Sequence, residues 1–155
     1  MIREVAAAAG KDGMAGGQAD DLAGEGKTLS LDEIERIYSG KTGALLTAAV
    51  RLGAILAGAE ERQIDDLTAY AKCLGLAFQI KDDILDVTGD SETLGKPTGS
   101  DVRSGKSNYV TVLGLEGAEE QLRVQILQAL AVLEPYGEQA AFLCELARFI
   151  ERREH

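Results

Sequence analysis

Three aspartates lie close together in an otherwise apolar stretch, FQIKDDILD, at residues 78–86. On a helix, Gln79, Asp82, Asp83 and Asp86 fall at i, i+3, i+4 and i+7, which places all four along one stripe. Like charges at this spacing repel each other unless cations neutralise them. Mg²⁺ prefers carboxylate oxygens and commonly bridges them to substrate phosphates. The aspartates are therefore candidate Mg²⁺ ligands, although the same spacing is also typical of the solvated face of an amphipathic helix.

The surroundings of the aspartates favour the metal interpretation. Apolar residues occupy most of the other positions, so the carboxylates and Lys81 interrupt an apolar helix. A cavity explains such an interruption better than bulk water does. We therefore predict that the aspartates face a cavity.

Three lysines are candidates for binding phosphate groups beside such metals. Lys41 begins a Lys-Thr-Gly element, Lys96 lies in GKPTGSD after the aspartates, and Lys106 follows ten residues later. Taken alone, Lys41 is more simply interpreted as a snorkelling surface residue. Lysines beside an Mg²⁺-binding helix can nevertheless contact the phosphate oxygens that the metals bind. Together with the aspartates, the three lysines predict a diphosphate site.

Helices are expected to position all of these residues. Ser30 and Glu33 form a capping signature directly before an apolar helical period, so a helix should begin near Leu31 and run to Gly58. Lys41-Thr42-Gly43 interrupts its middle. The later segments expected are a helix over 60–89, a long loop over 89–108, a run over 109–115, and helices near 117–134 and 138–152. A loop of this length in a compact domain is typical of a functional segment.

The first 24 residues combine an Ala-rich helical run with the small-residue stretch GMAGGQADDLAG. Glycines 13, 16 and 17 favour close contact between helices over a simple break. No segment alternates as a strand does. We therefore expect an all-α fold in which residues 1–155 belong to a single domain.

Composition excludes several classes of function. The 155 residues are 45% hydrophobic and 27% charged, as in soluble globular proteins, and the formal net charge of −10 argues against nucleic acid as a partner. No stretch reaches the roughly 20 apolar residues of a membrane span, and the start is too weakly apolar for a signal peptide. We expect a cytoplasmic protein with Cys73 and Cys144 as buried, reduced thiols.

The motifs resemble those of the short-chain trans-prenyl diphosphate synthases, with the bacterial farnesyl diphosphate synthases as the nearest group. The matching stretches are GMAGGQADDL, GEGKTLSLDEIERIYSGKTGALLTAAVRLGAILAG, GLAFQIKDDILDVTGD and LGKPTGSDVRSGKSNY. They cover roughly residues 12–115 in order, and the resemblance is to the C-terminal half of these enzymes.

This resemblance implies an isoprenoid-synthase helical bundle around a deep apolar cavity. The family condenses isopentenyl diphosphate with an allylic diphosphate, dimethylallyl or geranyl. Three Mg²⁺ ions between two aspartate-rich motifs draw off the allylic diphosphate and leave a carbocation, which the alkene of isopentenyl diphosphate attacks. The product expected here is farnesyl diphosphate. Such chemistry needs charge neutralisation at the leaving group and a dry pocket for the cation.

The resemblance also implies a role for each candidate residue. Asp82 corresponds to the principal metal ligand of the second motif, and Asp83 and Asp86 to nearby or water-mediated partners. The residues that would contact the allylic diphosphate are Lys41, Lys96 and Lys106. Those that would direct oxygen dipoles at the cation are Thr42, Gln79 and the Lys41 carbonyl. Those that would support the site from a neighbouring helix are Gln18 and Asp21, for which a simple polar helix contact is the alternative.

The resemblance covers only half of the length of these enzymes. They are about twice as long, and their first half carries the first aspartate-rich motif, the arginines that clamp the substrates and the determinants of product length. We therefore expect this chain to be an incomplete part of a homodimeric enzyme, inactive by itself. A fragment of a class I terpene synthase and a catalytically silent helical partner of a synthase are the alternatives. His155 is expected to be a solvated residue without a function.

Overall fold

The computed structural model describes residues 1–89 and 105–154. Lys96 and His155 lie outside these residues. The described part of the chain consists of helices and connecting segments without strands, so the all-α prediction is confirmed. The helices are α1 (Ile2–Ala9), α2 (Met14–Gly24), α3 (Leu31–Tyr38), α4 (Ala44–Leu56), α5 (Glu61–Thr88), α8 (Tyr109–Leu133) and α9 (Ala141–Arg152). Two shorter elements are the π-helical turn η1 (Ser39–Gly43) and the 3-10 helix η2 (Glu134–Ala140).

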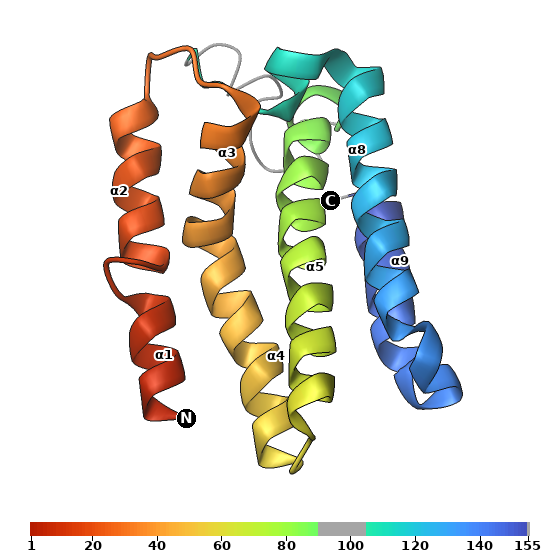
Figure 1. The fold of residues 1–155 in the computed structure, drawn as a ribbon. Coiled ribbons are helices and arrows are strands. Elements are labelled where there is room, and N and C mark those ends of the chain that lie inside the picture. The colour runs from red at the N-terminus through yellow and green to blue at the C-terminus, as the bar shows by residue number, and fades with distance from the viewer. Residues whose placement is uncertain (90–104, 155) are drawn as a thin grey trace.

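The helices run side by side in columns (Figure 1). The pair α1 and α2 forms the first column, and α3, η1 and α4 form the second. The long helix α5 is the third, and it contacts α4 on one side and α8 on the other. Helix α9 packs behind α8 and also contacts α5. Helix α5, which carries the aspartates, is therefore the centre of the bundle.

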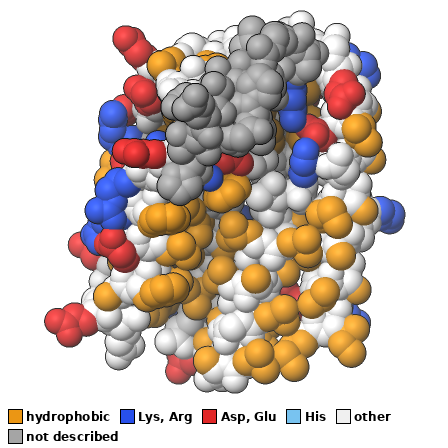
Figure 2. All heavy atoms as spheres, turned by 180° about the vertical axis from the view of Figure 1, so that it is seen from behind, with side chains coloured by type: hydrophobic (Ala, Val, Ile, Leu, Met, Phe, Trp, Pro, Cys, Tyr) orange, Lys and Arg blue, Asp and Glu red, His pale blue; other side chains and the backbone are white. Residues whose placement is uncertain are grey.

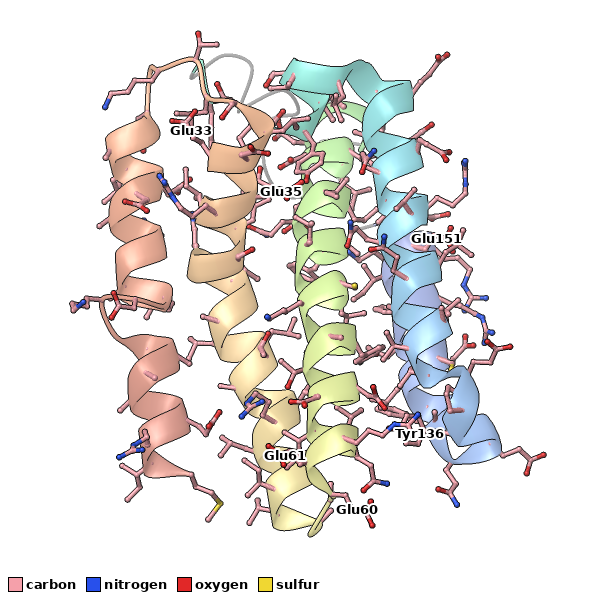
Figure 3. All side chains as sticks on the ribbon, viewed as in Figure 1. Glu33, Glu35, Glu60, Glu61, Tyr136 and Glu151 are labelled. Carbon is pink, nitrogen blue, oxygen red and sulfur yellow. The ribbon has the colours of Figure 1, made fainter. Side chains whose placement is uncertain are left out.

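Side-chain caps fix where the main helices begin. The Glu33 N–H donates to Ser30 Oγ at 3.4 Å and the Ser30 N–H donates to Glu33 Oε2 at 2.8 Å, which confirms the predicted start at Leu31. Helix α5 begins in the same way, because the Glu60 N–H donates to Gln63 Oε1 at 2.8 Å. Figure 3 shows Glu33 and Glu60 at opposite ends of the bundle, since the two columns run in opposite directions.

The breaks predicted from the sequence are also present. The Lys-Thr-Gly element lies in η1, where the π geometry joins α3 to α4 without a gap. Gly114 has φ 75° inside α8, which separates the run over 109–115 from the rest of that helix. Pro135 and Gly137 lie in η2, between α8 and α9.

Small residues bring α2 against η1, as the glycine spacing predicted. A Cβ atom added at Gly17 would lie 2.1 Å from the Lys41 backbone nitrogen and 2.5 Å from the Gly40 carbonyl carbon. Only glycine allows this approach, since real Cβ contacts do not fall below 3.0 Å. The contact places the chain around Lys41 directly against α2.

The core joins α3, α8 and α9 around α5. It contains Ile34, Ile37, Tyr38, Tyr70, Leu74, Ala77, Ile80, Ile84, Tyr109, Ala118, Leu122, Ile126, Ala129, Leu133, Ala147 and Ile150. Within residues 1–89 and 105–154, no helix combines the length and the apolar character needed to cross a bilayer. Cys73 and Cys144 are free thiols as predicted, but they are half-buried rather than buried.

Candidate functional site

Two of the predicted phosphate-binding lysines meet at one buried carboxylate. Asp21, whose side chain is 9% exposed, pairs through Oδ2 with Lys41 Nζ at 2.6 Å and through Oδ1 with Lys106 Nζ at 3.2 Å. Lys41 comes from η1, Asp21 from α2, and Lys106 from the segment before α8. Two ammonium groups on one carboxylate carry one net positive charge, and this charge suits the binding of an anionic group.

The protonation of Asp21 reflects these contacts. Burial alone would raise its pKa, but the hydrogen bonds and charges of Lys41 and Lys106 together hold it below the usual value. Asp21 is therefore ionised at neutral pH and fixes both ammonium groups. Thr42 follows Lys41 in η1 and Gln18 lies in α2 beside Gly17, and both side chains are half-buried.

Asp82 forms a second cluster on α5. Gln79 Nε2 donates to Asp82 Oδ2 at 3.2 Å, and Arg153 forms an ion pair with Asp82 Oδ1. Arg153 follows α9, so this contact joins two helices that are far apart in the sequence. The predicted pairing of Gln79 with the aspartates along one face is thus present for Asp82.

Asp83 points elsewhere, which corrects the expectation that all four polar residues share one stripe. It is 5% exposed and accepts hydrogen bonds from Tyr38 Oη, at 2.9 and 2.8 Å, and from the Tyr109 backbone N–H at 3.0 Å. Consecutive helical residues leave the axis about 100° apart, so Asp82 and Asp83 face different neighbours. Asp83 attaches the start of α8 to the middle of the bundle.

The rings around Asp83 extend this attachment. Tyr38 and Tyr109 are stacked with centroids 6.2 Å apart, and Tyr109 Oη donates to Glu35 Oε1 at 2.7 Å. In Figure 3, Glu35 lies on the side of α3 that faces α5. Burial, followed by the hydrogen bond to Glu35 and nearby negative charge, raises the pKa of Tyr109, so this hydroxyl stays protonated.

The donor set suits Mg²⁺ in part. Among residues 1–89 and 105–154, no group of three or more His, Cys, Asp or Glu side chains is arranged to hold a metal ion. The metal role of Asp82, Asp83 and Asp86 therefore stays a prediction. Asp82 and Asp86 still lie one turn apart on α5, and Asp82 already pairs with the guanidinium of Arg153. Carboxylates that attract a cation fit Mg²⁺ when phosphate oxygens and water complete its coordination.

Apolar surface accompanies the polar clusters. A hollow of about 470 Å³ between α1 and α4 is lined by Met1, Ile2, Val5, Ala6, Ala9, Leu52 and Leu56. Figure 2 shows apolar side chains gathered over the lower half of the rear face, with charged side chains mostly towards the upper end. The lining of this hollow is entirely apolar.

Sequence reasoning found the lysines but missed several of their neighbours. Arg153 is not among the predicted site residues, because a basic residue near the end of a helix is no specific signal in a sequence. Tyr38 and Tyr109 are not among the predicted site residues, although both contact Asp83. Lys96 lies outside the described residues, and the predicted roles of the site residues in binding remain predictions.

Comparison with known proteins places these features in context. A model of the polyprenyl synthetase family matches residues 3–141. The farnesyl diphosphate synthase of Geobacillus stearothermophilus is 46% identical over 158 positions, which cover 100% of this chain and 52% of that protein. The farnesyl diphosphate synthase of Escherichia coli K12 is 52% identical over 141 positions, covering 90% and 47%. The chain spans about half the length of these curated relatives.

Solved structures share the same arrangement of helices. The polyprenyl synthase of Caulobacter crescentus, complexed with calcium and isoprenyl diphosphate, has a TM-score of 0.87 at 26% identity. The match covers 99% of this chain and 59% of the synthase chain. The geranyltransferase of Helicobacter pylori, complexed with magnesium and isoprenyl diphosphate, has a TM-score of 0.81 at 32% identity, with 96% and 49% covered. These similarities confirm the expected helical bundle.

Proposed function

The chain belongs to the polyprenyl synthetase family, and from this premise we propose that the whole protein is a prenyltransferase. It condenses isopentenyl diphosphate with an allylic diphosphate, dimethylallyl or geranyl, to give farnesyl diphosphate. This chain is its C-terminal half, with the second aspartate-rich motif. The observation that carries the proposal is the pair of ammonium groups on the buried Asp21 carboxylate. The synthase names of the relatives do not favour the terpene synthase or silent-partner alternatives.

The two lysines bind the allylic diphosphate in this proposal. Asp21 holds Lys41 and Lys106 in place before substrate arrives, so little side-chain ordering remains to be done on binding. Charge-assisted hydrogen bonds from both ammonium groups then neutralise negative charge as the allylic C–O bond breaks. Lys96 is proposed as a third contact on the basis of its motif alone.

The aspartates of α5 would hold Mg²⁺ when the diphosphate is bound. Asp82 and Asp86 are the proposed ligands, and Asp83 supports them indirectly by fixing α5 to α3 and α8. When bound there, Mg²⁺ would supply charge stabilisation for the departing diphosphate.

The remaining residues act on the carbocation. The Gln79 amide nitrogen donates to Asp82, so the amide oxygen is the atom that we propose to face the carbocation. Thr42 and the Lys41 carbonyl add oxygen dipoles from η1, and Gln18 supports η1 from α2.

A binding measurement on the purified chain tests the diphosphate site. We expect geranyl diphosphate with Mg²⁺ to bind, and Lys41→Gln and Lys106→Gln each to weaken binding by about tenfold, as loss of a charged hydrogen bond predicts. Lys11→Gln is the matched control, because its side chain is 88% exposed and pairs with the adjacent Asp12. Equal affinity in all three variants would refute the proposed site.

An activity measurement tests whether the active site of this chain is incomplete, as proposed. With radiolabelled isopentenyl diphosphate, geranyl diphosphate and Mg²⁺, we expect no extractable farnesyl product from the chain alone. A product that disappears in Asp82→Ala would support the reaction but contradict the incomplete site.

The whole protein is proposed to be a homodimer, as the family resemblance implies. Ile2, Val5 and Leu22 are exposed apolar side chains on α1 and α2, which supports association through this column. Light scattering on the whole protein tests it, and a monomer at micromolar concentration would contradict it.

A further inference from the structure

Arg153 is held against the aspartate helix by several contacts at once. Its side chain is 11% exposed and forms the ion pair with Asp82 Oδ1. The same Nη2 donates to the Phe78 carbonyl oxygen at 3.0 Å, and the guanidinium lies 4.2 Å from the centroid of the Phe78 ring. A planar guanidinium suits this combination of stacking and hydrogen bonding. The side chain that follows α9 is thus docked on the second aspartate-rich motif.

This contact occupies the carboxylate that the proposed function assigns to metal. Arg153 takes Asp82 Oδ1 and Gln79 takes Oδ2, so both oxygens of Asp82 have protein partners. A metal ion cannot bind either oxygen without displacing or sharing one of these contacts. Arg153 is the partner with the positive charge, so it is the one that a cation would repel.

One observation indicates that the docked position carries a cost. Arg153 Nε is buried and has no hydrogen-bond partner within the described residues. An unsatisfied buried donor of this kind costs about 1–3 kcal/mol.

We propose that Arg153 is a built-in counter-ion of Asp82 that Mg²⁺ displaces when it binds. The proposal rests on the proposed function, because it takes Asp82 as a metal ligand. Arg153 is a positioning residue: it keeps the carboxylate neutralised and oriented while no metal is bound. Because linkage is reciprocal, Mg²⁺ binding at Asp82 and release of Arg153 favour each other.

Mg²⁺ titration of the purified chain, followed by calorimetry, tests the competition. We expect Arg153→Gln to bind Mg²⁺ about five- to tenfold more tightly than the unchanged chain, since a competing charge is removed. Arg152→Gln is the matched control: it removes the same charge one residue earlier, but its side chain is 63% exposed and pairs with Glu145 instead. The control should keep the original affinity.

A spectroscopic readout follows Arg153 itself in the unchanged chain. During the Mg²⁺ titration, the ¹⁵N resonance of Arg153 Nε should shift with the same midpoint as the calorimetric binding, while that of Arg152 Nε should not. This readout needs no variant, so it stands if Arg153→Gln fails to fold.

The outcomes separate the two proposals. If Asp82→Asn leaves Mg²⁺ binding unchanged, or if no version of the chain binds Mg²⁺, the proposed metal role of Asp82 fails and the counter-ion fails with it. If Asp82→Asn abolishes binding but Arg153→Gln has unchanged or weaker affinity, the metal role stands and the counter-ion is refuted. A stationary Arg153 Nε resonance at saturating Mg²⁺ refutes it as well.

Discussion

The approach of α2 to η1 makes Gly17 a sensitive position. A Cβ atom there would meet the Lys41 nitrogen at 2.1 Å and the Gly40 carbonyl carbon at 2.5 Å. Both neighbours are backbone atoms, so no flexible side chain can move aside. We therefore expect Gly17→Ala to force α2 and η1 apart and to shift Lys41 relative to Asp21.

The size of the effect follows from two opposing contributions. Overpacking of a well-packed contact costs about 1–3 kcal/mol, and a backbone clash belongs at the upper end of that range. Alanine in place of glycine within a helix returns about 1 kcal/mol. The expected net loss in the free energy of unfolding is about 2 kcal/mol, which for a chain of this length lowers the melting temperature by roughly 4–8 °C.

Urea denaturation followed by circular dichroism measures this change. Gly53→Ala is the matched control, because Gly53 also lies inside a helix and its added Cβ would meet nothing within 4 Å. The control should gain about 0.5–1 kcal/mol from helix propensity alone. If Gly17→Ala is as stable as Gly53→Ala, the reasoning about close contact is refuted.

Three further changes test other contacts. Asp21→Asn should reduce the loss of folding stability that the unchanged chain shows below about pH 4. The pKa of Asp21 is lower in the folded chain than its unfolded value of about 3.9, so its carboxylate stabilises the fold above that pH. This stabilisation is lost as the pH falls through the folded pKa. Thermal unfolding from pH 2 to 7 measures this, and a curve parallel to that of the unchanged chain would contradict it. Tyr38→Phe should cost about 1–3 kcal/mol in urea unfolding, because it removes a hydroxyl donor from the buried Asp83; a cost below 0.5 kcal/mol, taken as roughly the scatter of a surface change, would argue against that contact. Gly114→Ala should cost about 1 kcal/mol or more in the same assay, because φ is 75° there, and a gain in stability would mean that α8 straightens.

Local chemistry made the helices predictable. The capping pair Ser30 and Glu33, the Lys-Thr-Gly interruption and the turn at Pro135 are all signals within a few residues, and each appears in the structure where the sequence placed it. The glycine contact was predictable for a related reason, since small residues grouped on one helix indicate a close neighbour. The sequence did not identify that neighbour as η1.

Long-range partners limited the prediction of the site. The spacing of the aspartates predicts that Asp83 lies on the same stripe as Asp82. A stripe of i, i+3 and i+4 positions is broad, however, and Asp83 is buried at its edge, where it contacts Tyr38 and Tyr109. The contact of Arg153 with Asp82 joins residues 71 positions apart, and no local pattern predicts it. The lysines were found through their motifs, whereas their shared attachment to Asp21 emerged only from the packing of α2 against η1.

The π geometry of η1 has a consequence for how the length of this chain can change. A π turn contains one residue more than an α-helical path would need, so deletion of one residue from Ser39–Gly43 would let α3 and α4 merge into a regular helix. Everything before the deletion would rotate by about 100° relative to α4. Tyr38 would then turn away from Asp83. Substitutions in η1 alter single side chains, but a change in its length redirects a whole helix, so related sequences should keep the number of residues in this turn fixed.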